Sequence, residues 1–62
     1  MPIIQIEMFE GRTVEQKRNM ITKVTEAMVE TVNCTNESVK IIIRELKKEN
    51  LAEGGVLYLD KS

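Results

Sequence analysis

Two isoleucine-rich segments that flank one amphipathic segment constrain this 62-residue chain more than any other feature. Residues 3–9 and 39–46 are short and rich in β-branched residues, so both are predicted to be strands. Apolar residues between them recur at steps of three and four, which predicts a helix over residues 14–32. A strand, a helix and a second strand joined in this way favour a parallel strand pair with a right-handed crossover.

The predicted helix has a start signal in its sequence. Thr13 and Gln16 have the spacing of a capping box, in which each side chain accepts a hydrogen bond from the other residue's backbone amide. The predicted apolar stripe consists of Met20, Ile21, Val24, Ala27, Met28 and Val32. The opposite face, expected to be solvated, carries Lys17, Arg18, Lys23, Glu26 and Glu30.

The C-terminal part of the chain predicts a short hairpin. Gly54 and Gly55 form a turn signal between residues 51–52 and residues 56–59. The expected fold is therefore a single α/β domain over residues 1–62, in which a small β-α-β unit precedes the hairpin.

Both predicted strands are apolar on both faces. In the first strand, one face carries Ile3 and Phe9 and the other carries Ile4, Ile6 and Met8. In the second strand, one face carries Ile42 and Leu46 and the other carries Val39, Ile41 and Ile43. One helix covers only one face of such a pair, so the other face needs a second chain. A domain of about 60 residues is also marginal alone, and without disulfides or a metal its remaining stabiliser is association. We therefore expect an obligate homo-oligomer.

Composition excludes several classes of function. Nine Lys and Arg residues against ten Asp and Glu residues leave no basic excess for nucleic acid. The chain has no histidine, which removes Ser-His and Cys-His nucleophile pairs and imidazole acid–base chemistry. Its one cysteine cannot form an internal disulfide, and no Cys/His cluster is present to bind a metal. No targeting or membrane-spanning segment is recognisable, so a cytoplasmic location is expected.

The residue after the start methionine is the first candidate catalytic group. A methionine that precedes a small residue is usually removed, which would leave Pro2 with a free secondary amine. An ordinary α-amino group has a pKa of about 7.7–8. An apolar pocket and a nearby positive charge both lower the pKa of such an amine. A neutral Pro2 nitrogen could then act as a general base.

Several segments along the chain together resemble the 4-oxalocrotonate tautomerase family. They are Pro-Ile-Ile-Gln-Ile at residues 2–6, Glu-Gly-Arg at 10–12, Glu-Gln-Lys at 15–17, Ser-Val at 38–39 and Gly-Gly at 54–55. The resemblance implies a β-α-β protomer that assembles as a hexamer, usually a trimer of dimers. It also implies an isomerase that moves protons between carbon and oxygen of enols and 2-oxo acids. One such substrate is 2-hydroxymuconate, a compound of the type formed in aromatic catabolism. Members use the processed proline as base and need no cofactor or metal.

The resemblance assigns roles to three further residues. Arg12 would bind a substrate carboxylate and draw electron density toward it. Lys40 stands where well-known members have a second arginine, which contacts the carboxylate and oxygen at the reacting end. Leu51 replaces a phenylalanine that lines the pocket. Both departures put the dicarboxylate substrate 2-hydroxymuconate in doubt more than the tautomerase chemistry.

The predicted strands place these residues at two ends of the sheet. Pro2 and Lys40 begin parallel strands and share one end, whereas Arg12 follows the far end of the first strand. Seven strand residues put Arg12 roughly 20 Å from its own Pro2. We therefore expect an active site shared between subunits. Arg44 follows Lys40 on the same strand face but about 13 Å away, and is expected to be a surface charge.

Two alternatives remain open on sequence grounds. One is a hydratase or dehalogenase that keeps Pro2 protonated and uses it as an acid. The other is a non-enzymatic oligomeric module that binds a metabolite or partner and retains Met1.

Overall fold

The computed structural model describes residues 1–61 and contains the elements that the sequence predicts. Two long strands, β1 (Ile3–Phe9) and β2 (Lys40–Leu46), flank helix α1 (Val14–Val32). Two short strands follow, β3 (Ala52–Glu53) and β4 (Val56–Leu57). Single 3-10 turns occupy Asn36–Ser38, Lys48–Asn50 and Tyr58–Asp60. The predicted single domain extends to Ser62, which lies outside the described residues.

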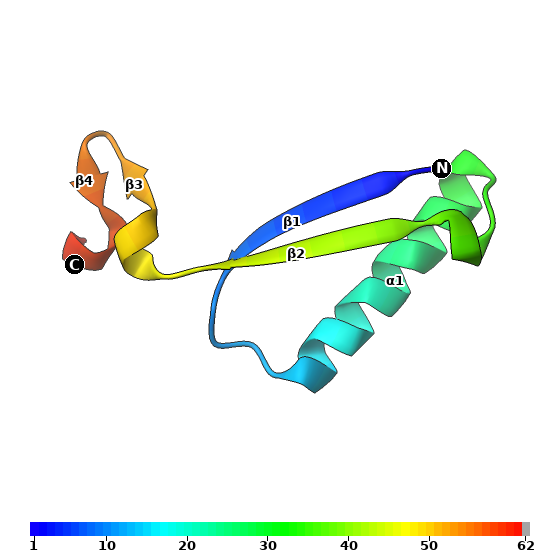
Figure 1. Cartoon of the computed structure of the whole chain (residues 1–62), viewed down its shortest axis with the longest axis horizontal. Helices are drawn as coiled ribbons and strands as arrows, with labels where there is room; N and C mark the ends of the chain where they lie inside the picture. Colours follow the sequence, from blue (N-terminus) through cyan, green and yellow to red (C-terminus); the bar gives the residue numbers. More distant parts are fainter. Residues whose placement is uncertain (62) are drawn as a thin grey trace.

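Strands β1 and β2 form a parallel pair, which confirms the predicted β-α-β unit (Figure 1). The register runs from Ile3 opposite Lys40 to Phe9 opposite Leu46. Because the two strands are equally long and in register, both begin at one end of the sheet and end at the other.

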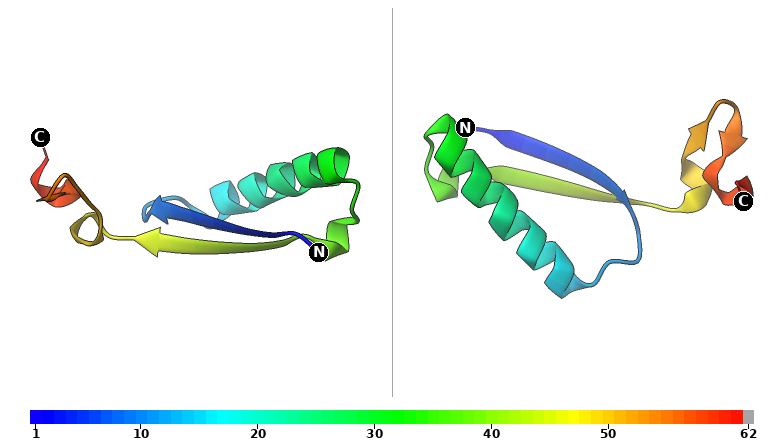
Figure 2. Two further views of the ribbon diagram at one scale, coloured as in Figure 1. Left: turned by 90° about the horizontal axis from the view of Figure 1, so that it is seen from above. Right: turned by 180° about the vertical axis from the view of Figure 1, so that it is seen from behind.

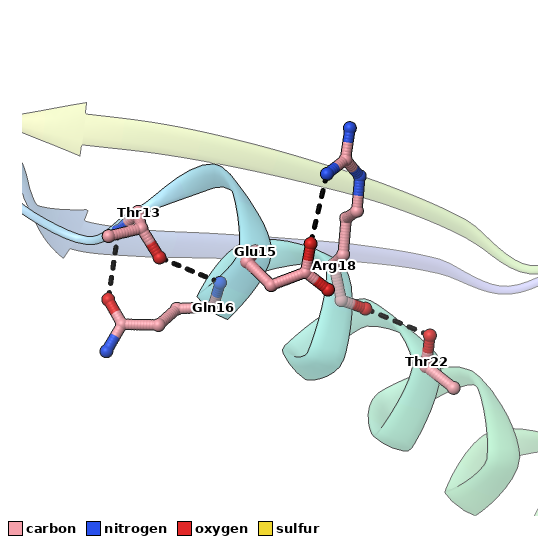
Figure 3. Close-up of polar contacts among 5 residues, drawn as sticks. All are labelled: Thr13, Glu15, Gln16, Arg18 and Thr22. Carbon is pink, nitrogen blue, oxygen red and sulfur yellow. Dashed lines mark hydrogen bonds and ion pairs between the residues drawn. The ribbon is translucent and has the colours of Figure 1, made fainter.

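Helix α1 starts and ends where the sequence signals predict. The Thr13 hydroxyl accepts a hydrogen bond from the Gln16 amide at 3.1 Å, and the Gln16 side chain accepts one from the Thr13 amide at 2.9 Å (Figure 3). Asn33 caps the end of the helix, and its φ of 57° is left-handed, a conformation that asparagine tolerates better than most residues.

One face of the β1–β2 pair is covered by α1, as the view along the sheet shows (Figure 2). The half-buried strand residues on this face are Ile4, Ile6, Met8, Ile41 and Ile43, and the half-buried apolar helix residues are Met20, Val24, Met28 and Val29. The predicted apolar stripe of α1 was wrong in part, since Ile21, Ala27 and Val32 are exposed. The nineteen-residue helix packs on a sheet of only two strands, which is too narrow to cover its whole apolar stripe.

The other face of the strand pair has no cover within residues 1–61. Ile3 and Ile42 lie on this open face and are 59% and 41% exposed. No hydrophobic side chain among the described residues is fully buried. The chain's accessible surface of 4973 Å² exceeds the roughly 4,100 Å² expected for a compact protein of this mass.

The C-terminal hairpin projects beyond the ends of the long strands (Figures 1 and 2). Gly54 and Gly55 have φ angles of 58° and 82°, the left-handed pair that a two-residue hairpin turn requires. This projection gives the chain a radius of gyration of 14.9 Å, compared with about 11 Å for a compact chain of this length. Within residues 1–61, α1 lacks the run of apolar residues that crossing a membrane would need.

Candidate active site

Pro2 and Lys40 lie side by side at the amino end of the strand pair. The Lys40 amide donates a hydrogen bond to the Pro2 carbonyl oxygen at 3.0 Å, and Lys40 is the register partner of Ile3, the residue after Pro2. Pro2 is half-buried, while Met1 is 81% exposed. The Lys40 side chain is exposed and makes no ion pair with residues 1–61. The structure therefore confirms the prediction that Pro2 and Lys40 lie at the same end of the strand pair.

Arg12 lies in the loop beyond the carboxyl end of the strand pair. The Glu10 amide donates to the Leu46 carbonyl at 3.0 Å, which extends the ladder by one bond. Gly11 then has a φ of 123°, a conformation that side-chain-bearing residues rarely adopt. This turn leads the chain out of the sheet, and Arg12 follows it with its side chain exposed and unpaired within residues 1–61.

Leu51 also lies at the carboxyl end of the strands. It lines an open hollow of about 260 Å³ together with Glu7, Met8, Phe9 and Leu46. The Tyr58 amide donates to the Leu51 carbonyl at 2.8 Å, and the Tyr58 and Phe9 rings lie 4.6 Å apart. These contacts attach the hairpin to the end of β1 and hold Leu51 there.

The four predicted site residues thus form two groups in one chain. Pro2 and Lys40 lie at the amino end, whereas Arg12 and Leu51 follow the carboxyl ends of seven-residue strands. At about 3.3 Å per residue, the two groups are separated by roughly 20 Å. A single small substrate cannot contact both groups of the same chain.

A second open hollow, of about 280 Å³, lies against α1 and is lined by Ile21, Thr22, Thr25, Glu26 and Asn36. It contains none of the predicted site residues. The part of the chain that the structure describes has no cluster of three or more side chains suited to hold a metal ion.

Arg44 lies on the open face, four residues after Lys40. Its guanidinium donates to the Gln5 side-chain oxygen at 3.4 Å, and its register partner on β1 is Glu7. These two neighbours on β1 keep the Arg44 side chain at the surface of the strand pair. They do not bring it to Pro2.

The structure corrects one expectation near Arg12. Lys17, expected on the solvated face of α1, forms an ion pair with Glu45 of β2 at 2.8 Å and is only 25% exposed. The signal was present in the sequence, because Lys17 lies three residues before Met20 and therefore shares the sheet-facing side of the helix.

Comparisons with known proteins agree with this arrangement of strands and helix. The model of the family "Tautomerase enzyme" matches residues 2–61. A 2-hydroxymuconate tautomerase of Bacillus subtilis is 46% identical over 55 residues, which are 89% of each chain. The crystal structure of YwhB, a homologue of 4-oxalocrotonate tautomerase, superposes with a TM-score of 0.93 at 41% identity, covering 98% of this chain and 100% of the other. A 4-oxalocrotonate tautomerase isozyme of Methylibium petroleiphilum superposes with a TM-score of 0.88 at 45% identity, over 94% and 91% of the two chains.

A small β-α-β enzyme fold with a C-terminal hairpin is thus common to this chain and to these tautomerases. The chain belongs to the 4-oxalocrotonate tautomerase family, and it is an isomerase of the tautomerase type. A small molecule is therefore its substrate.

Proposed function

We propose that this enzyme interconverts the enol and keto forms of 2-oxo acids, with 2-hydroxymuconate as the first substrate to test. The position of Pro2 beside Lys40 carries the proposal, because a backbone bond brings the residue with the potential base and a lysine together at one end of the sheet. The Bacillus subtilis relative, named a 2-hydroxymuconate tautomerase, supports the choice of substrate.

The proposed base is the Pro2 nitrogen after removal of Met1. The nitrogen takes the proton from the enol oxygen of the substrate and returns it to a carbon of the conjugated system, so no atom is gained or lost. In this proposal the positive charge of Lys40 would favour the neutral, proton-accepting form of the proline nitrogen. Neither step requires a metal or a cofactor.

The two carboxylates of 2-hydroxymuconate suit the two cations of the site. Lys40 lies beside Pro2 and would bind the carboxylate at the reacting end. Arg12 would bind the distant carboxylate and draw electron density along the conjugated system toward that end, which stabilises the dienolate formed on proton transfer.

This pairing requires at least two chains, because Arg12 is roughly 20 Å from its own Pro2. The exposed Ile3 and Ile42 on the open face and the projecting hairpin both support an assembly of protomers. We propose a homo-oligomer, a hexamer built as a trimer of dimers, in which Arg12 and Leu51 of one protomer complete the Pro2 site of another.

Two measurements test the proposed function together. Intact mass of the protein isolated from its cells should be lower by one methionine, since Pro2 must be the first residue. Arg12→Ala should lower kcat/KM for 2-hydroxymuconate by roughly 10²-fold, the usual cost of losing one donor to a developing charge. Arg18→Ala is the matched control, because Arg18 is an exposed arginine on α1 whose ion-pair partner within residues 1–61 is Glu15, at 3.1 Å.

A retained Met1 in the active enzyme would rule out Pro2 as the base. Equal rates in the Arg12 and Arg18 variants would remove the carboxylate-binding role. An enzyme that adds water to unsaturated acids but exchanges no proton on 2-hydroxymuconate would instead be a hydratase.

A further inference from the structure

Lys17 and Glu45 form the one ion pair within residues 1–61 that joins α1 to the sheet. Their Nζ–Oε2 distance is 2.8 Å, and the two side chains are 25% and 33% exposed. The other ion pairs of the helix, Arg18–Glu15 and Lys23–Glu26, are internal i,i+3 pairs with more than half of each side chain exposed. Partial burial reduces screening by water and salt, so Lys17–Glu45 is the strongest of the three.

The pair lies next to the loop that carries Arg12. Lys17 is in the first turn of α1, where its amide donates to the Thr13 carbonyl at 3.1 Å. Glu45 is the residue before the end of β2 and lies opposite Met8. On the other side of the loop, the Glu10 amide is bonded to the Leu46 carbonyl at 3.0 Å. Gly11 and Arg12 are therefore held between two attachments to the end of β2.

Lys17 also neutralises the negative charge of Glu45, which affects the neighbouring Arg12. An anionic carboxylate at the end of β2 attracts any cation of the neighbouring loop, and the Arg12 guanidinium is such a cation. With Lys17 bound at 2.8 Å, Glu45 is neutralised by a residue that the substrate does not use. Arg12 thus keeps its guanidinium for an external anion.

We propose that Lys17 and Glu45 are positioning residues that hold the Arg12 loop and keep Arg12 available for the distant carboxylate of a dicarboxylate substrate. This inference rests on the proposed role of Arg12, and it assigns substrate selectivity to a pair that itself touches no substrate.

The test compares kcat/KM for a dicarboxylate, 2-hydroxymuconate, with kcat/KM for a monocarboxylate, phenylenolpyruvate. Phenylenolpyruvate has its carboxylate at the reacting end, so it does not need the Arg12 site. Lys17→Met should lower the dicarboxylate-to-monocarboxylate ratio roughly 3- to 10-fold, mostly through KM for 2-hydroxymuconate. Lys23→Met, which breaks an exposed pair of 3.7 Å on the same helix, is the matched control and should leave the ratio unchanged.

Two further variants separate positioning from general damage. In Lys17→Met/Glu45→Gln the uncompensated carboxylate is absent, so the ratio should recover part of the loss seen in Lys17→Met alone. Lys17→Arg keeps the charge and should retain the wild-type ratio, which also provides a folded comparison if Lys17→Met assembles poorly.

Two kinds of result would overturn the inference. A fall in both activities by the same factor in Lys17→Met, or a ratio as low in the Lys23 variant, would overturn the inference and leave the proposed function standing. If Arg12→Ala itself leaves the ratio unchanged, the assignment of Arg12 fails and the inference fails with it.

Discussion

In the proposed site, Lys40 is the residue that departs most from the family resemblance. An ammonium group is a compact point charge, whereas a guanidinium offers two parallel donors to a carboxylate. The backbone around position 40 is fixed by the bond from the Lys40 amide to the Pro2 carbonyl. A change of side chain at this position therefore alters the donor geometry without moving Pro2.

We predict that Lys40→Arg raises kcat/KM for 2-hydroxymuconate by roughly five- to tenfold, because a bidentate pair adds a second charge-assisted hydrogen bond. Steady-state kinetics at one pH and salt concentration would measure the gain. Lys23→Arg, the same substitution on the exposed face of α1, serves as the control. A lower value for Lys40→Arg would show that the pocket favours an ammonium group, and an equal value would show that the second donor adds nothing.

The end of the sheet at which a site residue lies was easier to predict than the side-chain contacts that hold it there. The shared end of Pro2 and Lys40 follows from the parallel register alone, and the structure confirms it. Leu51 was predicted to line a pocket, but its place near the end of β1 depends on the 4.6 Å contact between Phe9 and Tyr58. That contact joins residues 49 positions apart in an irregular segment, where no periodic pattern exists to reveal it.

At the scale of elements, α1 shows how a local signal determines a boundary. Its cap is complete, with both the Thr13 hydroxyl and the Gln16 side chain bonded to backbone amides. Farther along the same helix, the Thr22 hydroxyl donates to the Arg18 carbonyl at 2.9 Å (Figure 3). That bond shares an acceptor already used by the helix, so it adds little to stability.

We predict that Thr13→Ala lowers the free energy of unfolding by about 0.5–2 kcal/mol per chain, the usual cost of an N-cap. Thr22→Ala removes a hydroxyl from the same helix and should be neutral or slightly stabilising. Urea denaturation followed by circular dichroism, at one protein concentration, would compare the two. Equal losses would mean that the cap contributes nothing beyond a generic threonine-to-alanine change.

The boundaries of the long elements were predictable because capping and alternation are local. Helix α1 begins at Val14 and ends at Val32 as predicted, and the hairpin turn falls at Gly54 and Gly55. The sides of the helix stripe were less predictable. Whether Ile21 packs on the sheet or lies beside it depends on the crossing of the helix over only two strands, which is a tertiary property.

At the scale of the whole molecule, the chain is too open to be a complete catalyst in the proposed mechanism. Its accessible surface is 4973 Å², with one face of the sheet uncovered within residues 1–61. The two groups of site residues lie at opposite ends of seven-residue strands. If catalysis needs both groups, a functional site exists only where protomers meet.

Mixed oligomers test this directly. One parent is a chain with an N-terminal extension, which keeps the Pro2 nitrogen an amide and removes the base. The other parent is Arg12→Ala, which keeps the base but lacks the carboxylate-binding group. Each parent alone should be nearly inactive on 2-hydroxymuconate, with the extended chain losing roughly 10²–10⁴ in rate.

Dissociating the parents, mixing them in equal amounts and reassembling them should restore activity if the site is shared. A site that takes Pro2 from one protomer and Arg12 from another has both intact in about a quarter of random combinations, as expected for equivalent subunits in a symmetric assembly. A site within one chain always carries one defect, so mixing would restore nothing. Recovery near a quarter of wild-type activity, with unmixed parents treated identically staying inactive, would therefore establish that the assembly itself is the catalytic unit.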